Sequence, residues 1–313
     1  MPLLADYAIT PDVFDVTSYS TAGECEARLE TIREAMLTEG LVRNLRDGQW
    51  HGLFSSNDRP WHRRGTELVK KLSNQGRLVP HEPALYASPA HDRGWCAEAL
   101  ATHAGNPLTG GVIVTEPIKS EYRRNPRVAR IDRLGGTPWW RARSPSVRLN
   151  RTRTAYETQL DLVLRHSNSI IFIDPHQDPR KPGYHDFGAL LSRAGSRTPA
   201  PRIEIHRVCY EGSGPARWLP MRDDPLYFER RFHQELAEPL RSGRLSAEVF
   251  VWDDFHDRYL ISNLIGISLS NGFDTRPQST TTWHRLGRDD GDNIRREFHP
   301  ATGPHKLQAR FEI

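Results

Sequence analysis

The chain has 313 residues, of which 37% are hydrophobic, and its mean hydropathy is -0.65. This composition is typical of a polar-surfaced protein with one large domain or two modest ones, and no apolar run approaches the roughly 20 residues of a membrane span. The formal net charge of +4 is a modest excess and does not by itself indicate nucleic-acid binding.

The start of the chain has no basic segment followed by an apolar run, so we do not expect a secretory signal. The three cysteines are far apart and form no C-x-x-C pattern. These features favour a cytoplasmic protein with reduced thiols. No metal-ligand spacing and no nucleotide-binding motif is present, so we expect neither a metal nor a cofactor.

Residues 1–145 are expected to form a mixed α+β unit that recognises a partner, a signal or nucleic acid. Thr21 and Glu24 form a capping box, and apolar residues at helical spacing then predict a helix that ends near Gly40. Shorter helices are expected at 66–72 and 95–103, a strand at 110–118, and a connection at 133–145. In that connection, Trp139 and Trp140 belong either to a core or interface or to a surface that stacks on unpaired bases.

Residues 146–313 are expected to form an α/β sandwich with a central sheet, because predicted helices alternate with predicted strands. Thr154 and Glu157 suggest the start of a helix, and a buried strand ends at Asp174-Pro175. The predicted helices are 154–166, 187–193, 227–240 and 292–298. The predicted strands are 170–173, 202–209, two strands within 249–274 that are followed by a polar turn, and 279–286.

One stretch of this second unit has a recognisable spacing of polar residues. It reads His256-x-Arg258, four residues, Asn263, six residues, Ser270-Asn271, two residues, Asp274. This pattern resembles the signature of the phospholipase D superfamily, which is His-x-Lys, four residues, Asp, six residues, Gly-Ser, two residues, Asn. The histidine and the spacing are kept, while each other signature position has been exchanged for a small polar, charged or cationic residue.

The resemblance implies a metal-independent phosphodiesterase or nuclease with a phospholipase D-like fold. His256 would be the nucleophile, forming a phosphohistidine, and Arg258 would hold the phosphate oxygens. Asn263, Asn271 and Asp274 would orient the reacting groups and stabilise the charged phosphoryl group. Asp274 would also supply a carboxylate that orients His256. The chain has a single signature, so the resemblance implies a homodimer that brings two histidines together.

Further residues are candidates for binding the substrate. A band rich in arginine precedes and opens the second unit, and arginine grips phosphates with two hydrogen bonds, so we expect nucleic acid (DNA or RNA) as partner. Ser270 lies in the signature, and Asp174 and His176 follow a strand end. The candidate binding residues are Ser270, Asp174, His176, His206, Arg148, Arg151 and Arg153.

The closest resemblance is to the divergent phospholipase D-like domain at the C-terminus of MIT-domain proteins and to bacterial relatives. The bacterial relatives suggest an effector of an anti-phage defence system, with other subunits of a defence complex as partners. The MIT-type domains are regarded as having lost catalysis. The alternative is therefore an inactive module that binds nucleic acid or a protein partner without cleaving it.

Overall fold

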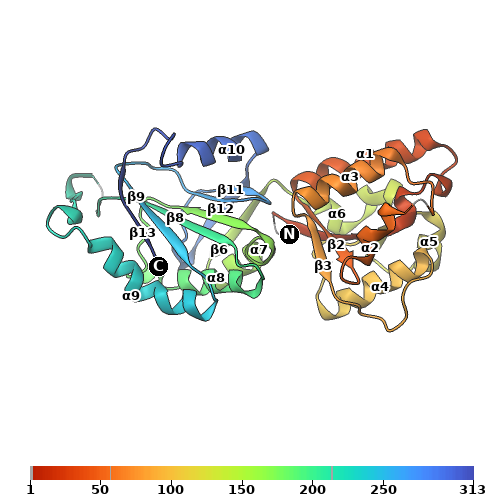
Figure 1. Cartoon of the computed structure of the whole chain (residues 1–313), viewed down its shortest axis with the longest axis horizontal. Helices are drawn as coiled ribbons and strands as arrows, with labels where there is room; N and C mark the ends of the chain where they lie inside the picture. The colour runs from red at the N-terminus through yellow and green to blue at the C-terminus, as the bar shows by residue number, and fades with distance from the viewer. Residues whose placement is uncertain (1–2, 57, 213) are drawn as a thin grey trace. The chain divides into compact units, whose positions relative to one another are not determined.

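The computed structural model describes residues 3–56, 58–212 and 214–313, and the chain divides into two compact units, Met1–Ser144 and Pro145–Ile313 (Figure 1). We call them the N-terminal unit and the C-terminal unit. The first contains a five-stranded sheet and the second an eight-stranded sheet, both accompanied by helices, so the protein is of the α/β class.

All neighbouring strands of the N-terminal sheet run parallel, in the order β3-β2-β1-β4-β5. The strands are β1 (Ala5–Ile9), β2 (Gly40–Leu45), β3 (Leu78–His81), β4 (Val112–Val114) and β5 (Val128–Arg130). The helices are α1 (Ala22–Thr38), α2 (Gln49–Gly52), α3 (Arg63–Asn74), α4 (Asp92–Gly105), α5 (Glu116–Glu121) and α6 (Pro138–Arg141).

The α+β expectation for this unit is thereby corrected, because a parallel sheet with crossover helices is an α/β arrangement. Strands β1 and β2 have no alternating pattern because charged residues occupy buried positions in both. Arg43 of β2 donates to Asp6 of β1 at 2.8 Å, and the Arg43 side chain is fully buried. This pairing allows two charges inside the sheet, where sequence patterns favour apolar residues.

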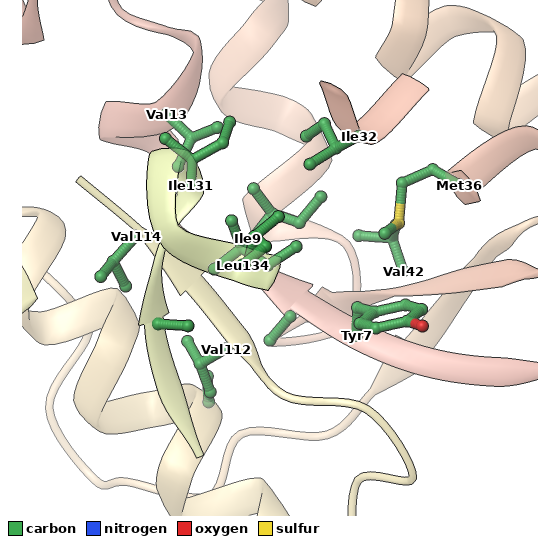
Figure 2. Packing of buried hydrophobic residues seen from close by; sticks show 14 of the residues in the cluster. Tyr7, Ile9, Val13, Ile32, Met36, Val42, Val112, Val114, Ile131 and Leu134 are labelled. Atoms are coloured by element: carbon green, nitrogen blue, oxygen red, sulfur yellow. The ribbon is translucent and has the colours of Figure 1, made fainter. Parts of the chain in front are cut away.

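The core of the N-terminal unit lies between the sheet and α1, which begins at the predicted cap: Thr21 accepts from the N–H of Glu24. Figure 2 shows Ile32 and Met36 of α1 close to Val42, with Ile131 and Leu134 from the segment after β5. Trp139 and Trp140 are both buried and pack their rings against Tyr7 of β1. The tryptophan pair is therefore part of the core.

The C-terminal sheet has the order β13-β9-β8-β7-β10-β11-β12-β6. Its strands are β6 (Ser146–Arg151), β7 (Ser169–Ile173), β8 (Arg202–Val208), β9 (Ala247–Trp252), β10 (Tyr259–Ser262), β11 (Gly266–Leu269), β12 (Arg276–Arg285) and β13 (Leu307–Glu312). The helices are α7 (Arg153–His166), α8 (Phe187–Arg193), α9 (Tyr227–Ser242) and α10 (Arg288–Glu297).

Helices cover both faces of this sheet, with α7, α8 and α9 on one side and α10 on the other (Figure 1). On the α10 side, Ile294 packs with alternate residues of the central strands, among them Ile173 and Phe250. The expected sandwich with a central sheet is therefore present. The helix predicted at 154–166 begins at Arg153. Its N-cap is Thr152, two residues before the proposed cap Thr154, since Thr152 accepts from the N–H of Ala155.

Strand directions decide which residues meet in this unit. Strands β7, β8 and β9 are parallel, and β10 is antiparallel to β7 with Tyr259 opposite Ile173. The start of β10 and the end of β11 therefore lie at the edge where β7 ends. Among the residues that the structure describes, no helix is long and apolar enough to cross a membrane.

Candidate active site

A buried carboxylate, Asp174, organises the sheet edge at the end of β7. Its Oδ2 atom accepts from the hydroxyl of Tyr184 at 2.9 Å and from the N–H of Phe273 at 3.1 Å. Its Oδ1 atom accepts from the N–H of His176 at 3.0 Å and lies 3.8 Å from Nε of Arg258. With 1% of Asp174 exposed, these partners replace water around the charge.

Tyr184 acts as a permanent donor to this carboxylate. Burial, and next the negative charge of Asp174, raise the pKa of Tyr184 well above its ordinary value. The phenol therefore stays protonated at neutral pH. A buried tyrosine with its hydroxyl on a carboxylate helps to fix the loop that carries it.

Gly272 lets the turn after β11 approach Asp174. A Cβ atom at this position would lie 1.7 Å from Oδ2 of Asp174, which no side chain can occupy without displacing the carboxylate. The turn that contains Ser270, Asn271 and Asp274 is thus held against the end of β7. This close approach depends on glycine for lack of a side chain, not for backbone strain.

His256 lies on the loop between β9 and β10 and is exposed. In the described part of the chain its imidazole makes no hydrogen bond, while its carbonyl oxygen accepts from Nη1 of Arg258 at 3.2 Å. Arg258 therefore connects the histidine loop to Asp174, with 29% of its side chain exposed. An accessible histidine and a guanidinium on the same loop are groups that can bind a phosphate.

Asp254, which the sequence analysis did not identify, lies within the electrostatic influence of His256. Asp254 accepts from the Tyr210 hydroxyl at 2.6 Å and from Arg217 at 3.3 Å. Burial raises the pKa of Asp254, but the Tyr210 hydrogen bond and the charges of Arg217 and His256 outweigh it, so the pKa lies below its ordinary value. Asp254 is thus an anion in the electrostatic environment of His256.

His176 is a second histidine at this edge. It is partly buried, and its ring meets that of Tyr210 edge-on, with centroids 6.3 Å apart. Burial lowers its pKa, and the positive charges of Arg258 and Lys181 lower it further, against the opposing effect of Asp174. His176 is therefore a neutral imidazole at pH 7 in the free protein.

The loop that carries His176 is held by hydrogen bonds from two arginines. Arg207, which is fully buried, donates to the carbonyl of Gln177 at 2.8 Å and to Glu211 at 3.1 Å. Arg231 of α9 donates to Asp178 at 2.6 Å. Charged hydrogen bonds of this kind restrict a loop that would otherwise sample many conformations.

Asp274 has a different environment from the expected one. Its carboxylate pairs with Arg151 and, at 3.2 Å, with Arg276. Its backbone carbonyl accepts from Tyr156 at 3.1 Å. These contacts make Asp274 an anchor between the turn and β6, and no contact among the described residues joins its carboxylate to His256.

Asn263 is not brought to this edge. It follows β10, which is four residues long, and so lies at the opposite end of that strand from Arg258. Its side-chain oxygen accepts from the N–H of Asn168 at 2.6 Å and of Ser169 at 3.3 Å. The residue therefore ties together the start of β7 and the end of β10.

The other candidate residues are distributed as follows. His206 is fully buried, stacked on Phe250 at 4.7 Å and accepting from Trp252 at 2.9 Å, so it has no surface for a substrate. Ser270 is exposed and donates to the carbonyl of Thr282, and Asn271 is partly buried in the same turn.

The three arginines of the band separate by environment. Arg151 is buried on Asp274. Arg153 is half exposed and pairs with Glu157 one turn along α7. Arg148 is exposed on the edge strand β6 and donates to Thr280. Of the three, only Arg148 and Arg153 present a cation at the surface.

A groove of about 890 Å³ lies beside the contacts of Asp174 and Asp274. Its lining includes Tyr184 and Asp274, with Lys181, Gly183 and Arg276. Lys181 pairs with Glu211 at 2.5 Å, and 40% of its side chain is exposed. Among the described residues, no group of three or more His, Cys, Asp or Glu side chains is placed to hold a metal ion.

Several residues of this edge have no signal in the sequence pattern. Tyr184, Tyr210, Asp254 and Arg217 come from three separate connections and reach this edge through contacts that are distant in sequence. Asp254 alone had a sequence cue, since it lies two residues before His256.

Searches with family models and among curated proteins give no match to this chain. Among solved structures, the archaeal chromatin protein TrmBL2, described with a novel mode of DNA binding, is 10% identical with a TM-score of 0.28, over 74% of this chain and 77% of that one. Polyphosphate kinase from Porphyromonas gingivalis is 12% identical with a TM-score of 0.29, over 94% of this chain and 45% of the kinase. This chain thus spans less than half of that kinase, and TM-scores this low support no conclusion about fold or activity.

Proposed function

We propose that the C-terminal unit hydrolyses phosphodiester bonds of nucleic acid through a covalent intermediate on His256. The observation that supports this most is the sharing of one oxygen, Oδ1 of Asp174, by Arg258 and by the backbone of His176. This shared contact holds a cation and a second histidine beside the loop of the exposed His256. An imidazole nucleophile, a guanidinium and a second imidazole are the groups that phosphoryl transfer without a metal requires.

In the first step, a ring nitrogen of His256 attacks phosphorus, and the bond from phosphorus to the leaving oxygen breaks. Arg258 holds the non-bridging oxygens. His176 gives its proton to the leaving oxygen, and the bound phosphodiester favours this role because its negative charge raises the pKa of a nearby imidazole. In the second step, neutral His176 takes a proton from water, the water oxygen bonds to phosphorus, and the bond from His256 to phosphorus breaks.

His176 thereby takes the role that the resemblance assigns to a histidine of a second copy. Both histidines come from one chain in this proposal. The homodimer remains a prediction of the resemblance, and the experiment below distinguishes the two sources of the second histidine.

Cleavage of single- and double-stranded DNA and RNA in the presence of EDTA tests the proposal. We expect cleavage by the wild type, loss of cleavage in His256→Ala, and retention in His233→Ala, which removes an exposed histidine from α9. A covalent protein–nucleic-acid adduct trapped by denaturation at alkaline pH should be linked through a phosphorus–nitrogen bond to histidine in the wild type, and it should not form in His256→Ala.

His176→Ala separates the two sources of the second histidine. We expect this variant to lose most activity on nucleic acid and to keep more of it on bis(para-nitrophenyl) phosphate, whose leaving group needs no proton. Full activity of His176→Ala on nucleic acid would instead favour the homodimer. If the wild type binds nucleic acid and never cuts it, the binding module is the better account.

A further inference from the structure

We propose that Trp218 and the neighbouring Arg217 form a stacking subsite for an unpaired nucleobase, so that the substrate of the proposed phosphodiesterase is single-stranded nucleic acid. This inference rests on the proposed function. It concerns the segment between β8 and α9, which the sequence analysis did not single out.

The segment exposes several large apolar side chains to solvent. Five large hydrophobic side chains are exposed in the described part of the chain, and three of them are Trp218 (49% exposed), Leu219 (39%) and Leu226 (51%). Scattered apolar residues are ordinary on a protein surface, but a local group of this kind indicates a binding surface.

The indole of Trp218 is held in place although it is exposed. The backbones of Trp218 and Glu211 exchange two hydrogen bonds of 3.0 Å each, which makes an antiparallel bridge. The indole and the ring of Tyr227 form a T-shaped contact, with centroids 5.7 Å apart. A ring positioned in this way loses little conformational entropy when a base stacks on it.

Arg217 connects this ring to the histidine site. Its guanidinium lies over the ring of Tyr210, 3.7 Å from the centroid, and donates to Asp254, two residues before His256. Tyr210 in turn contacts the ring of His176. The exposed indole of Trp218 therefore follows directly after Arg217 in the chain. Arg217 contacts Tyr210, which packs on His176, and Asp254, which lies two residues before His256.

The chemistry of this subsite selects unpaired bases. The faces of bases within a duplex are covered by their neighbours, whereas a single strand presents them to aromatic side chains. Arg217 and Arg258 supply positive charge for the phosphates on either side of a stacked base. An exposed indole next to Arg217, which contacts Tyr210 and Asp254, suits a strand whose bases stack outside while its backbone passes over the site.

The test measures binding in an inactive background, His256→Ala, so that substrate is not consumed. Oligothymidylate and oligouridylate serve as single strands, and a duplex of mixed sequence serves as the comparison. Added Trp218→Ala should weaken single-strand binding roughly tenfold, while Trp218→Phe should restore most of it. Leu85→Ala is the matched control, because it removes an exposed apolar side chain without a ring from a different segment of the chain, and it should leave binding unchanged.

Equal single-strand binding by the parent and Trp218→Ala would overturn the inference and would leave the surface as a docking site for a protein. An equal loss for duplex and single strand would overturn it too, because stacking discriminates between them. Hydrolysis of bis(para-nitrophenyl) phosphate by the wild type reports on the proposed function separately, since this diester has no base. An unchanged thermal midpoint in Trp218→Ala ensures that the protein is folded.

Discussion

Gly272 and Asp174 lie so close that a Cβ atom on the glycine would be 1.7 Å from a carboxylate oxygen. The contact joins the turn after β11 to the end of β7. The same oxygen of Asp174 accepts the N–H of Phe273, so the turn is both packed and hydrogen-bonded there.

Gly272→Ala should destabilise the C-terminal unit, because the new methyl group displaces Asp174 from Tyr184 and Phe273. We expect the free energy of unfolding to fall by about 2–3 kcal/mol, the range for overpacking a close contact. Denaturant unfolding measures it. Gly291→Ala in α10 is the control, since nothing lies within 4 Å of a Cβ there, and it should stabilise by about 0.5–1 kcal/mol. Equal effects of the two changes would contradict the packing argument.

Arg258→Lys and Arg258→Ala should separate charge from geometry. The lysine keeps a cation near the phosphate oxygens and should retain much of the phosphodiesterase rate. The alanine removes the cation, and we expect kcat to fall by about 10²–10³, as when a donor to a developing charge is lost. Steady-state cleavage of a labelled strand gives both values. An alanine variant as active as the wild type would remove Arg258 from the mechanism.

Arg151→Ala should destabilise the protein far more than Arg153→Ala. Arg151 is buried on Asp274, and its loss leaves that carboxylate with Arg276 alone, which we expect to cost about 2–3 kcal/mol. Arg153 belongs to an exposed helical pair worth about 0.3–0.5 kcal/mol. Urea unfolding of the two variants side by side checks the difference.

The arginine band can also be tested as a nucleic-acid surface. Arg148→Gln should reduce the slope of log affinity against log salt by about 1 if its guanidinium contacts a phosphate. Its present partner, the hydroxyl of Thr280, is neutral, so the charge is available for a phosphate. An unchanged salt slope would place the phosphate contacts elsewhere.

His206 should make the protein less stable in weak acid. Burial lowers its pKa in the folded state, against the hydrogen bond and charge of Glu204. The unfolded state then binds more protons below the ordinary histidine pKa of about 6.5, so stability is complete above that pH and decreases as the pH falls, by at most about 1.4 kcal/mol per pH unit. Unfolding curves from pH 7.5 to pH 5.5, a range chosen to span about 6.5, should show this decrease in the wild type. The decrease should be smaller in His206→Asn and as large as in the wild type in His233→Asn.

Local patterns were sufficient for much of the C-terminal unit. The helix at Phe187–Arg193 is confirmed with its bounds, and the strand before Asp174 lies within β7. The helix has apolar residues at helical spacing, and the strand is a short unbroken apolar run. Each has a polar or Pro-containing boundary. In the N-terminal unit, β1 and β2 contain Asp6 and Arg43, whose pairing across strands cannot be detected within either segment.

The candidate site shows the same limit. The spacing of the signature placed His256 and Arg258 together, because only Asp257 separates them on the same loop. It could not place Asn263, since a four-residue strand extends roughly 13 Å and carries that residue to the far end. Nor could it identify Tyr210 or Tyr184, which reach the edge from other connections.

The strand order also bears on how this edge responds to thermal fluctuation. Strands β7, β9, β10 and β11, which lead into the histidine and aspartate segments, are all interior to the sheet, and β6 and β13 form its two margins. Amide protons of the margins should exchange with solvent through local fraying, whereas those of the interior strands should exchange only when most of the unit opens. The framework beneath the two histidines is then as persistent as the C-terminal unit itself, and mobility is confined to the loops that it supports.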